Sequence, residues 1–130
     1  MEKIFKENIE VSLAGIEYKT IEPTGKKVIE ASDTFSIVNV TRNTALISIE
    51  RKLVADVIKP FELIVKAQVG FEALDGVELI NHFTKEYLRE HVNELCGVPM
   101  SFISALITQI TGSFGGFPLI TPAIIVQDNK

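Results

Sequence analysis

The side chains best suited to chemistry lie between residues 82 and 91. His82 and Glu86 are four positions apart, and Glu90 follows one helical turn later. On a helix this spacing gives two metal ligands, or a base and an acid that orients it. A third strong ligand is missing, because His91 lies on a different side and the sequence has a single cysteine, Cys96. A solvated helix face with ordinary ion pairs is therefore the favoured interpretation.

Nucleophilic and phosphate-binding chemistry has no better support. No serine lies in an elbow motif or has a histidine placed to activate it, and this holds for Ser12, Ser36, Ser48 and Ser113. The glycine-rich run 112–116 follows a predicted helix, whereas a phosphate cradle needs backbone N–H groups at the start of one. We therefore predict a protein that is not an enzyme and uses no cofactor or metal. The alternative is a small-ligand-binding or hydrolytic domain that uses His82 or His91.

The composition points instead to a protein that must cover apolar surface. Hydrophobic residues make up 46% of the 130 positions, charged residues make up 23%, and the mean hydropathy is +0.25. A chain of this length fits one domain, which we place at residues 1–130. So much apolar side chain must fill a core or form a patch that meets a partner. We expect a homo-oligomer or a surface that binds a partner.

The charge and the N-terminal sequence narrow the partners and the compartment. The net charge is −4 and the pI is near 5.2, so a run of phosphates could not be neutralised. The basic pairs at 26–27 and 51–52 are expected in a turn or on a solvated strand. The first eight residues are rich in charge and lack the apolar stretch of a signal peptide. We expect a cytoplasmic protein that does not bind nucleic acid.

Alternating hydrophobic residues predict four strands in the first half of the chain. They cover about 4–21, 34–41, 45–54 and 61–72. In the last strand every odd position from Phe61 to Phe71 is apolar, which is typical of a strand with one buried face. In the first strand the alternation changes phase at Ala14-Gly15, which predicts a β-bulge. Short links between the strands favour an antiparallel meander.

The sequence after residue 75 predicts two helices. The first covers about 77–95, and its apolar stripe includes Ile80, Phe83 and Tyr87. We expect these three side chains at an oligomer interface, because the stripe needs cover. The predicted fold class is therefore α+β, a four-stranded antiparallel sheet followed by two helices.

The second predicted helix is unusual because it has no charged face. Gly97 is expected to end the first helix, and Pro99 is expected to begin the second, which runs to about Thr111. No charged side chain occurs from Leu95 to Gln127. This helix is too short for a membrane span, which needs about 20 residues. We therefore expect it to be buried or under a partner, without membrane insertion.

Two stretches of the sequence resemble the family of the protein-export chaperone SecB. The first is the tail, where Ile107-Thr108 on the predicted helix is followed by the run from Gly115 to Pro122. This is similar to the family's Gly-x-Phe-Pro-x-x-x-x-x-Pro ending, with the two prolines closer together. The second is Ile4 to Val11, which is similar to the family's first strand in its aliphatic-aromatic pair and later alternation. Four strands followed by helices is also the family's order.

The resemblance implies an ATP-independent chaperone with a SecB-like fold. Members of the family form tetramers and bind unfolded polypeptides along apolar surfaces that strand and C-terminal helix residues line. The candidate client-binding residues in this chain are Phe5, Ile9, Phe102, Leu106 and Ile110. The expected function is that of a holdase for unfolded or extended polypeptides, in protein export or beside a toxin–antitoxin pair.

Two departures from the family count against docking on the SecA export motor. Acidic docking positions of the family's first strand align with Asn8 and Ser12, which are both neutral. Export members often carry an acidic, metal-binding tail, whereas this sequence ends Gln127-Asp128-Asn129-Lys130. A SecB-like chaperone of a toxin–antitoxin pair fits the residues equally well. The identity of the clients is not encoded in any motif that we identify.

Overall fold

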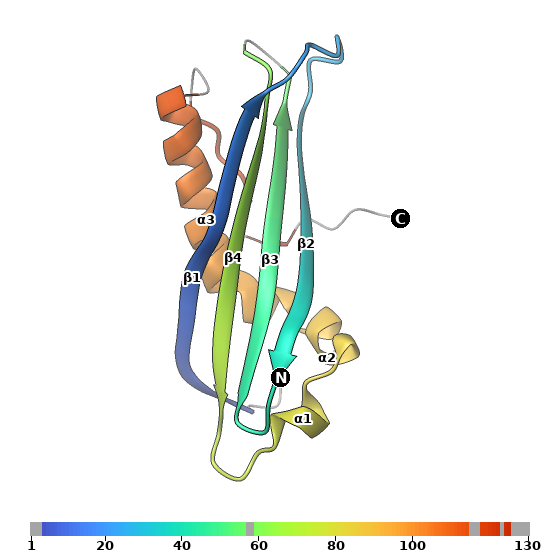
Figure 1. The fold of residues 1–130 in the computed structure, drawn as a ribbon, viewed down its shortest axis with the longest axis vertical. Coiled ribbons are helices and arrows are strands. Elements are labelled where there is room, and N and C mark those ends of the chain that lie inside the picture. The colour runs from blue at the N-terminus through green and yellow to red at the C-terminus, as the bar shows by residue number, and fades with distance from the viewer. Residues whose placement is uncertain (1–3, 57–58, 115–117, 123, 126–130) are drawn as a thin grey trace.

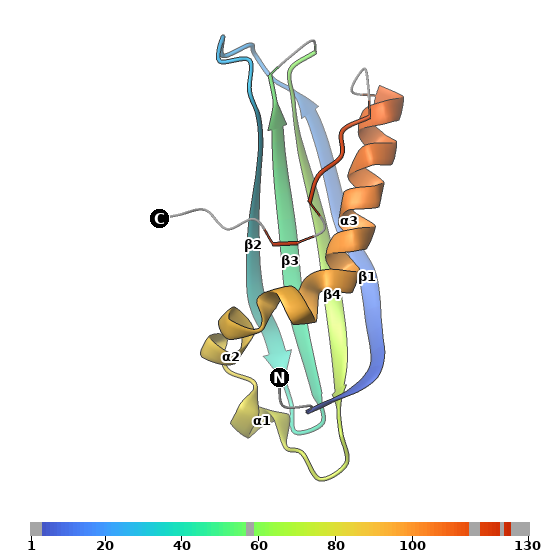
Figure 2. The same cartoon turned by 180° about the vertical axis from the view of Figure 1, so that it is seen from behind.

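The fold consists of one antiparallel sheet with a long helix across one face (Figures 1 and 2). The computed structural model describes residues 4–56, 59–114, 118–122 and 124–125. The strands are β1 (Phe5–Thr20), β2 (Ile29–Val40), β3 (Thr44–Ala55) and β4 (Phe61–Ala73), in the order β1-β4-β3-β2. The predicted four-stranded antiparallel sheet is confirmed. The predicted meander is wrong for the first strand, because β1 pairs with β4 and not with β2. β1 and β2 are therefore the two edges of the sheet.

The inner face of the sheet is apolar because the alternation of β3 and β4 stays in phase. The odd positions of β4 from Phe61 to Phe71 are buried, and Ile47 and Ile49 on β3 are completely buried beside them. The predicted bulge in β1 is confirmed, since the register shifts between Leu13 and Gly15. The extra residue keeps the apolar side chains before and after it on the same face of the sheet.

The first predicted helix is wrong, because the structure divides it. The helices are α1 (Leu79–His82), α2 (Lys85–Glu90) and α3 (Val92–Phe114). The division lies at Thr84, which has an extended backbone and whose side chain accepts a hydrogen bond from the N–H of Tyr87. A threonine that caps the next helix in this way ends the preceding one. Both short helices lie at the end of the sheet near the β2–β3 turn (Figure 1).

The predicted boundary between the two long helices is also wrong, because α3 continues through it. Gly97 lies inside α3 without a left-handed backbone, and Pro99 lies inside it too. Proline lacks the N–H that would bond four residues back, so it bends a helix without always ending it. Figure 2 shows α3 crossing the sheet and then turning to run along β4.

The observed length of α3 contradicts the prediction that this helix is too short to span a membrane. With 23 residues, α3 is long and apolar enough to cross a membrane by length and composition alone. The prediction that it is too short is therefore wrong. Its stripe of Met100, Ile103 and Ile107 is nevertheless buried in the core against the sheet. This packing is the role of α3 in the described fold.

Candidate functional site

The predicted group of chemical side chains at residues 82–91 is not assembled. His82 ends α1 and Glu86 lies in the first turn of α2, so the helix division separates them. Both are exposed, and so is Glu90. Across the described ranges, no group of three or more His, Cys, Asp or Glu side chains is placed to hold a metal ion. The spacing in sequence therefore does not become a site in space.

His91 and Cys96 are packed against neighbouring side chains of the fold and are not placed for chemistry. The His91 ring lies 4.5 Å from the Tyr87 ring between centroids, and its Nδ1 lies 3.8 Å from a carboxylate oxygen of Glu94. Burial raises the pKa of the Cys96 thiol to about 12, with a smaller contribution from the charge of Asp33. A thiol with this pKa has almost no thiolate at neutral pH, so Cys96 acts as a small apolar side chain.

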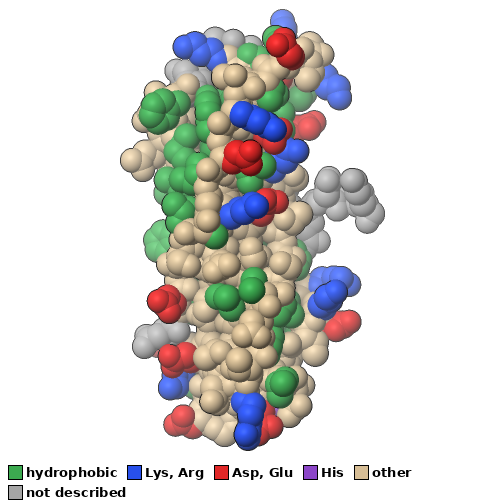
Figure 3. Space-filling view, in the orientation of Figure 1, with side chains coloured by type: hydrophobic (Ala, Val, Ile, Leu, Met, Phe, Trp, Pro, Cys, Tyr) green, Lys and Arg blue, Asp and Glu red, His purple; other side chains and the backbone are tan. Residues whose placement is uncertain are grey.

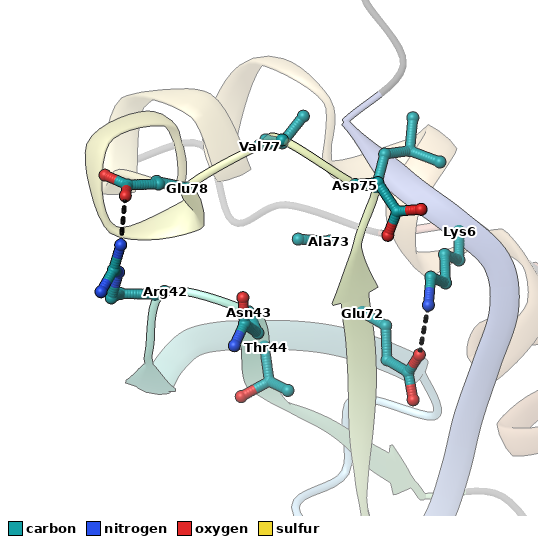
Figure 4. A pocket seen from close by; sticks show the side chains of 11 residues that line it. Lys6, Arg42, Asn43, Thr44, Glu72, Ala73, Asp75, Val77 and Glu78 are labelled. Atoms are coloured by element: carbon teal, nitrogen blue, oxygen red, sulfur yellow. Dashed lines mark hydrogen bonds and ion pairs between the residues drawn. The ribbon is translucent and has the colours of Figure 1, made fainter.

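A cavity of about 750 Å³ lies where the β2–β3 turn meets the loop between β4 and α1 (Figure 4). Its charged side chains pair across the walls. Lys6 Nζ lies 3.4 Å from Glu72 Oε2, and Arg42 Nη2 lies 2.7 Å from Glu78 Oε1. Asp75 also lines the cavity. Because most of these charges already neutralise one another, the cavity offers a ligand little that would hold it, and we do not favour it as the site.

An apolar groove between β1 and α3 is a better candidate, and we call it the β1 groove. It contains two cavities that follow one another along the strand. One, of about 90 Å³, is lined by Val11, Ser12, Leu13, Val65, Ala67, Phe102, Ile103 and Leu106. The other, of about 270 Å³, is lined by Ile4, Phe5, Lys6, Glu7, Ile9, Phe71, Glu94, Leu95 and Val98. Most of these side chains are apolar.

The β1 groove is open because α3 packs on β4 and leaves the edge strand β1 partly uncovered. The inward side chains of β1 therefore reach solvent, and Leu13 is 57% exposed and Ile16 44% exposed. Across the groove, Phe102 of α3 is 59% exposed. Figure 3 shows hydrophobic side chains gathered on this side of the molecule, over β1 and α3. A contiguous apolar surface of this kind is typical of a binding site for another polypeptide.

Four of the five predicted client-binding residues line the β1 groove. Phe102 and Leu106 line the smaller cavity, and Phe5 and Ile9 line the larger one. Phe5 is a floor residue, because it is 7% exposed and its ring packs 4.8 Å from that of Phe71. Ile110 is half-buried against the core further along α3 and lines neither cavity.

Sequence reasoning missed two exposed hydrophobic residues of the β1 groove, Leu13 and Val98. Leu13 shares its face of β1 with Ile9, so the alternation already placed it there. Val98 lies between Gly97 and Pro99, where the sequence predicted a helix boundary, and it is 50% exposed on α3. A correct helix prediction was needed to place Val98 beside the groove.

The three predicted interface residues do not share one stripe. Ile80 is 57% exposed on α1, Phe83 is buried, and Tyr87 is half-buried. The Phe83 ring packs within its own chain, 5.5 Å from that of Phe5 and 5.6 Å from that of Tyr87. Their separation follows from the division of the helix at Thr84. Contact of these residues with another subunit stays a prediction.

The other side of α3 is filled by residues 118–122 and 124–125, which we call the strap. Figure 2 shows the strap running back beside α3 and then crossing β3 toward β2. The Ser104 hydroxyl donates to the carbonyl of Thr121 at 2.5 Å, and the Thr108 hydroxyl donates to that of Leu119 at 2.7 Å. The Leu119 N–H donates to Thr111 Oγ1 at 2.8 Å. These contacts explain the uncharged polar face of α3.

Arg51 of β3 holds the far end of the strap. Its side chain is fully buried, and two of its nitrogens bind the two carboxylate oxygens of Asp33, each at 2.7 Å. The guanidinium also donates to Thr121 Oγ1 at 3.0 Å, to the carbonyl of Pro122, and to the carbonyl of Ile124 at 2.7 Å. A bidentate ion pair and three further acceptors match the fork of donors that arginine presents.

The buried position of Arg51 overturns one expectation from the sequence. The basic pair at 51–52 was predicted in a turn or on a solvated strand, which is correct for Lys52 and wrong for Arg51. The signal that could have found it is phase, because Arg51 occupies an odd position of β3 together with the buried Ile49 and Leu53. A charge in phase with a core stripe requires a buried partner, and Asp33 of β2 is its cross-strand neighbour.

The fold is similar to that of a known chaperone. No family model and no curated protein matches the sequence. The SecB-like chaperone of Mycobacterium tuberculosis, solved in complex with a ChAD peptide from the HigA1 antitoxin, matches with a TM-score of 0.71 and 13% identity over 90% of this chain and 86% of that one. A protein of unknown function from Streptococcus agalactiae matches with a TM-score of 0.49 and 13% identity over 88% of this chain and 96% of that one, too weakly to establish a shared fold. The chain has the SecB-like fold that the sequence resemblance implied.

Proposed function

We propose that this protein is an ATP-independent holdase that binds unfolded or extended polypeptides in the β1 groove, in the cytoplasm. The observation that carries the proposal is a groove with exposed apolar walls, Leu13 on one side and Phe102 on the other, in a SecB-like fold. Removing apolar client surface from water is favourable by itself, so binding needs no nucleotide. Charged lining residues occur at one end of the groove alone, among the residues that line the two cavities.

The edge position of β1 suits an extended client. β1 is the last strand of the sheet, and β4 is its one strand partner in the described chain. An extended segment that lies beside β1 can pair with its outer backbone groups and place alternate side chains in the groove. Main-chain pairing with shallow apolar pockets gives affinity without a strict sequence requirement, as a holdase needs.

The outer face of the sheet helps to decide whether the holdase acts in protein export or beside a toxin–antitoxin pair. One row across all four strands consists of Ser36, Ser48, Gln68 and Ser12, so it has no charge. The family resemblance associates SecA docking with acidic residues at two positions of the first strand, which align here with the neutral Asn8 and Ser12. The neutral row therefore supports a chaperone of a toxin–antitoxin pair over one of export, and the antitoxin peptide bound by the Mycobacterium tuberculosis chaperone supports the same setting.

A homo-oligomer, with a tetramer as the expected state, is part of the proposal. Apolar side chains away from the β1 groove are also exposed, including Ile80 on α1 at 57% and Phe114 at the end of α3 at 72%. A subunit that leaves such side chains in water gains by association. These two residues lie at opposite ends of the helical layer, so more than one contact surface is available.

Replacement of Phe102 by Ser tests the proposed function. The parent protein should keep a reduced, unfolded model protein in solution without ATP, with a mass above 14.4 kDa by light scattering. Phe102→Ser should weaken client binding about ten-fold or more, as the loss of a buried aromatic contact does. The mass and circular dichroism should not change, because Phe102 is 59% exposed.

The matched control is Val38→Ser, which removes a 50% exposed side chain from β2 at the opposite edge of the sheet. Val38→Ser should bind clients as the parent does. An equal loss of client binding in both variants would show that clients bind non-specifically to exposed apolar side chains and not in the β1 groove. If the parent protein holds no unfolded client, the proposed function is wrong.

A further inference from the structure

The contacts that hold the strap recognise its main chain. The hydroxyls of α3, Asn93 and Arg51 bind the carbonyl oxygens of Leu119, Thr121, Pro122 and Ile124 and the N–H groups of Leu119 and Ile125. Two contacts involve a strap side chain, that of Thr121, whose Oγ1 accepts from Arg51 and donates to Ser104 Oγ. Main-chain groups are the same in every polypeptide, so most of these contacts do not select a sequence.

Two side chains provide the apolar part of strap binding. Ile125 is 6% exposed in the core, and Leu119 is partly buried against it. Ile120 and Ile124 instead point into solvent, at 89% and 56% exposed. An occupant of this trough therefore needs apolar side chains six residues apart, and it is free at several positions between them.

The strap lies on the sheet without joining it. Its described residues form no strand, and the four strands pair with one another without it. Removal of the strap would therefore break no ladder hydrogen bond of the sheet. Simple loss of the strap would leave Arg51 and the hydroxyls of Ser104 and Thr108 without these acceptors, which is costly. Exchange for another extended chain would restore the same kinds of contact.

We propose that the trough beneath the strap is a second polypeptide-binding site and that the strap is its resident occupant, which an extended, uncharged segment of a client replaces. This inference rests on the proposed holdase function. The occupant is uncharged because Arg51 and Asp33 already neutralise each other there, and another buried charge would have no partner. The strap thus covers the polypeptide-binding trough until an extended client segment competes for the trough.

A disulfide that locks the strap tests this proposal. Ser104 Oγ and Thr121 Oγ1 lie 3.3 Å apart, so cysteines at both positions can form a bond across them. Cys96 can stay, because burial and a pKa of about 12 keep its thiol out of exchange. The probe is a fluorescent peptide with the sequence of residues 118–125. The reduced double variant S104C/T121C should bind it, and the oxidised form should bind about ten-fold more weakly, since the competent state is no longer populated.

The two redox states of one variant share a sequence, so a folding defect cannot explain a difference between them. A peptide with Leu119→Asp is the matched control and should not bind either state. Equal binding of the unmodified peptide in both states, or binding in neither, would overturn the inference. Client retention that Phe102→Ser abolishes but oxidation does not would leave the holdase intact, so the two proposals fail separately.

Discussion

The two sides of α3 treat an extended chain differently. On the β1 side, the wall and floor are apolar, and Leu13 and Phe102 face solvent across an open groove. On the β2 side, hydroxyls of α3 and the buried guanidinium of Arg51 hold the chain's own strap. One helix therefore presents an apolar face to an open groove and a hydroxyl face to a filled trough.

The difference follows from where the sheet has backbone groups to offer. β1 is an edge strand, so a chain beside it can pair with backbone N–H and C=O groups. β3 lies inside the sheet and its ladder groups pair with β2 and β4. A chain that crosses β3 must have its main chain satisfied by side chains instead, because unpaired buried carbonyls are costly. Ser104, Thr108 and Arg51 meet that need.

Removal of the Arg51 charge should have the largest effect on the stability of the strap side. Arg51→Met removes the ion pair of the fully buried Asp33 carboxylate with Arg51 and the hydrogen bonds of Arg51 to the strap carbonyls. We expect a loss of about 4 kcal/mol in the free energy of unfolding, as for other broken buried pairs, measured by urea denaturation. The control is Arg42→Met, whose exposed pair with Glu78 should contribute less than about 1 kcal/mol. Similar losses in the two variants would mean that the strap side does not depend on its buried ion pair.

A single hydroxyl should have a smaller effect, confined to the strap side. Ser104→Ala leaves the Thr121 carbonyl without the α3 hydroxyl and should cost about 1 kcal/mol. Ser101→Ala is the matched control, because the exposed Ser101 hydroxyl bonds to the Gly97 carbonyl of its own helix. It should change the free energy of unfolding by less than about 0.5 kcal/mol. Thermal melts of both variants measure the difference, and a larger loss in Ser101→Ala would contradict the role given to Ser104.

The strands were largely predictable because their period is short and their signal is local, although β2 begins at Ile29, five residues before the predicted start at Thr34. Alternation placed β4 within one residue at its end and located the bulge of β1 at Ala14-Gly15. The helices were not, because Thr84, Gly97 and Pro99 each allow two outcomes that tertiary packing decides. The cap at Thr84 ended a helix, whereas Pro99 did not begin one.

The candidate site was predictable in part for the same reason. Phe5, Ile9, Phe102 and Leu106 could be named from strand phase and helix face, and the structure brings them to one groove. The strap side could not be derived, since its contacts join residues far apart in sequence, such as Arg51 and Ile124. The hydroxyls of α3 were visible in the sequence, but their acceptors are main-chain atoms, which every residue has.

Salt should have the smallest effect on client affinity. Its effect should differ between the two cavities of the β1 groove. The cavity around Phe102 has no charged lining residue, while the cavity around Phe5 is also lined by Lys6, Glu7 and Glu94. Apolar contact is not screened by ions, whereas exposed charges are screened beyond a Debye length of about 8 Å at physiological ionic strength. Affinity for an unfolded client should therefore change less than about two-fold between low and physiological salt, as a titration at two ionic strengths would measure. The residual salt dependence should only decrease in Glu94→Gln, because Lys6 and Glu7 remain, and it should persist unchanged in Phe102→Ser. A steep fall with salt in the parent protein would mean that charge, and not the apolar wall of α3, holds the client.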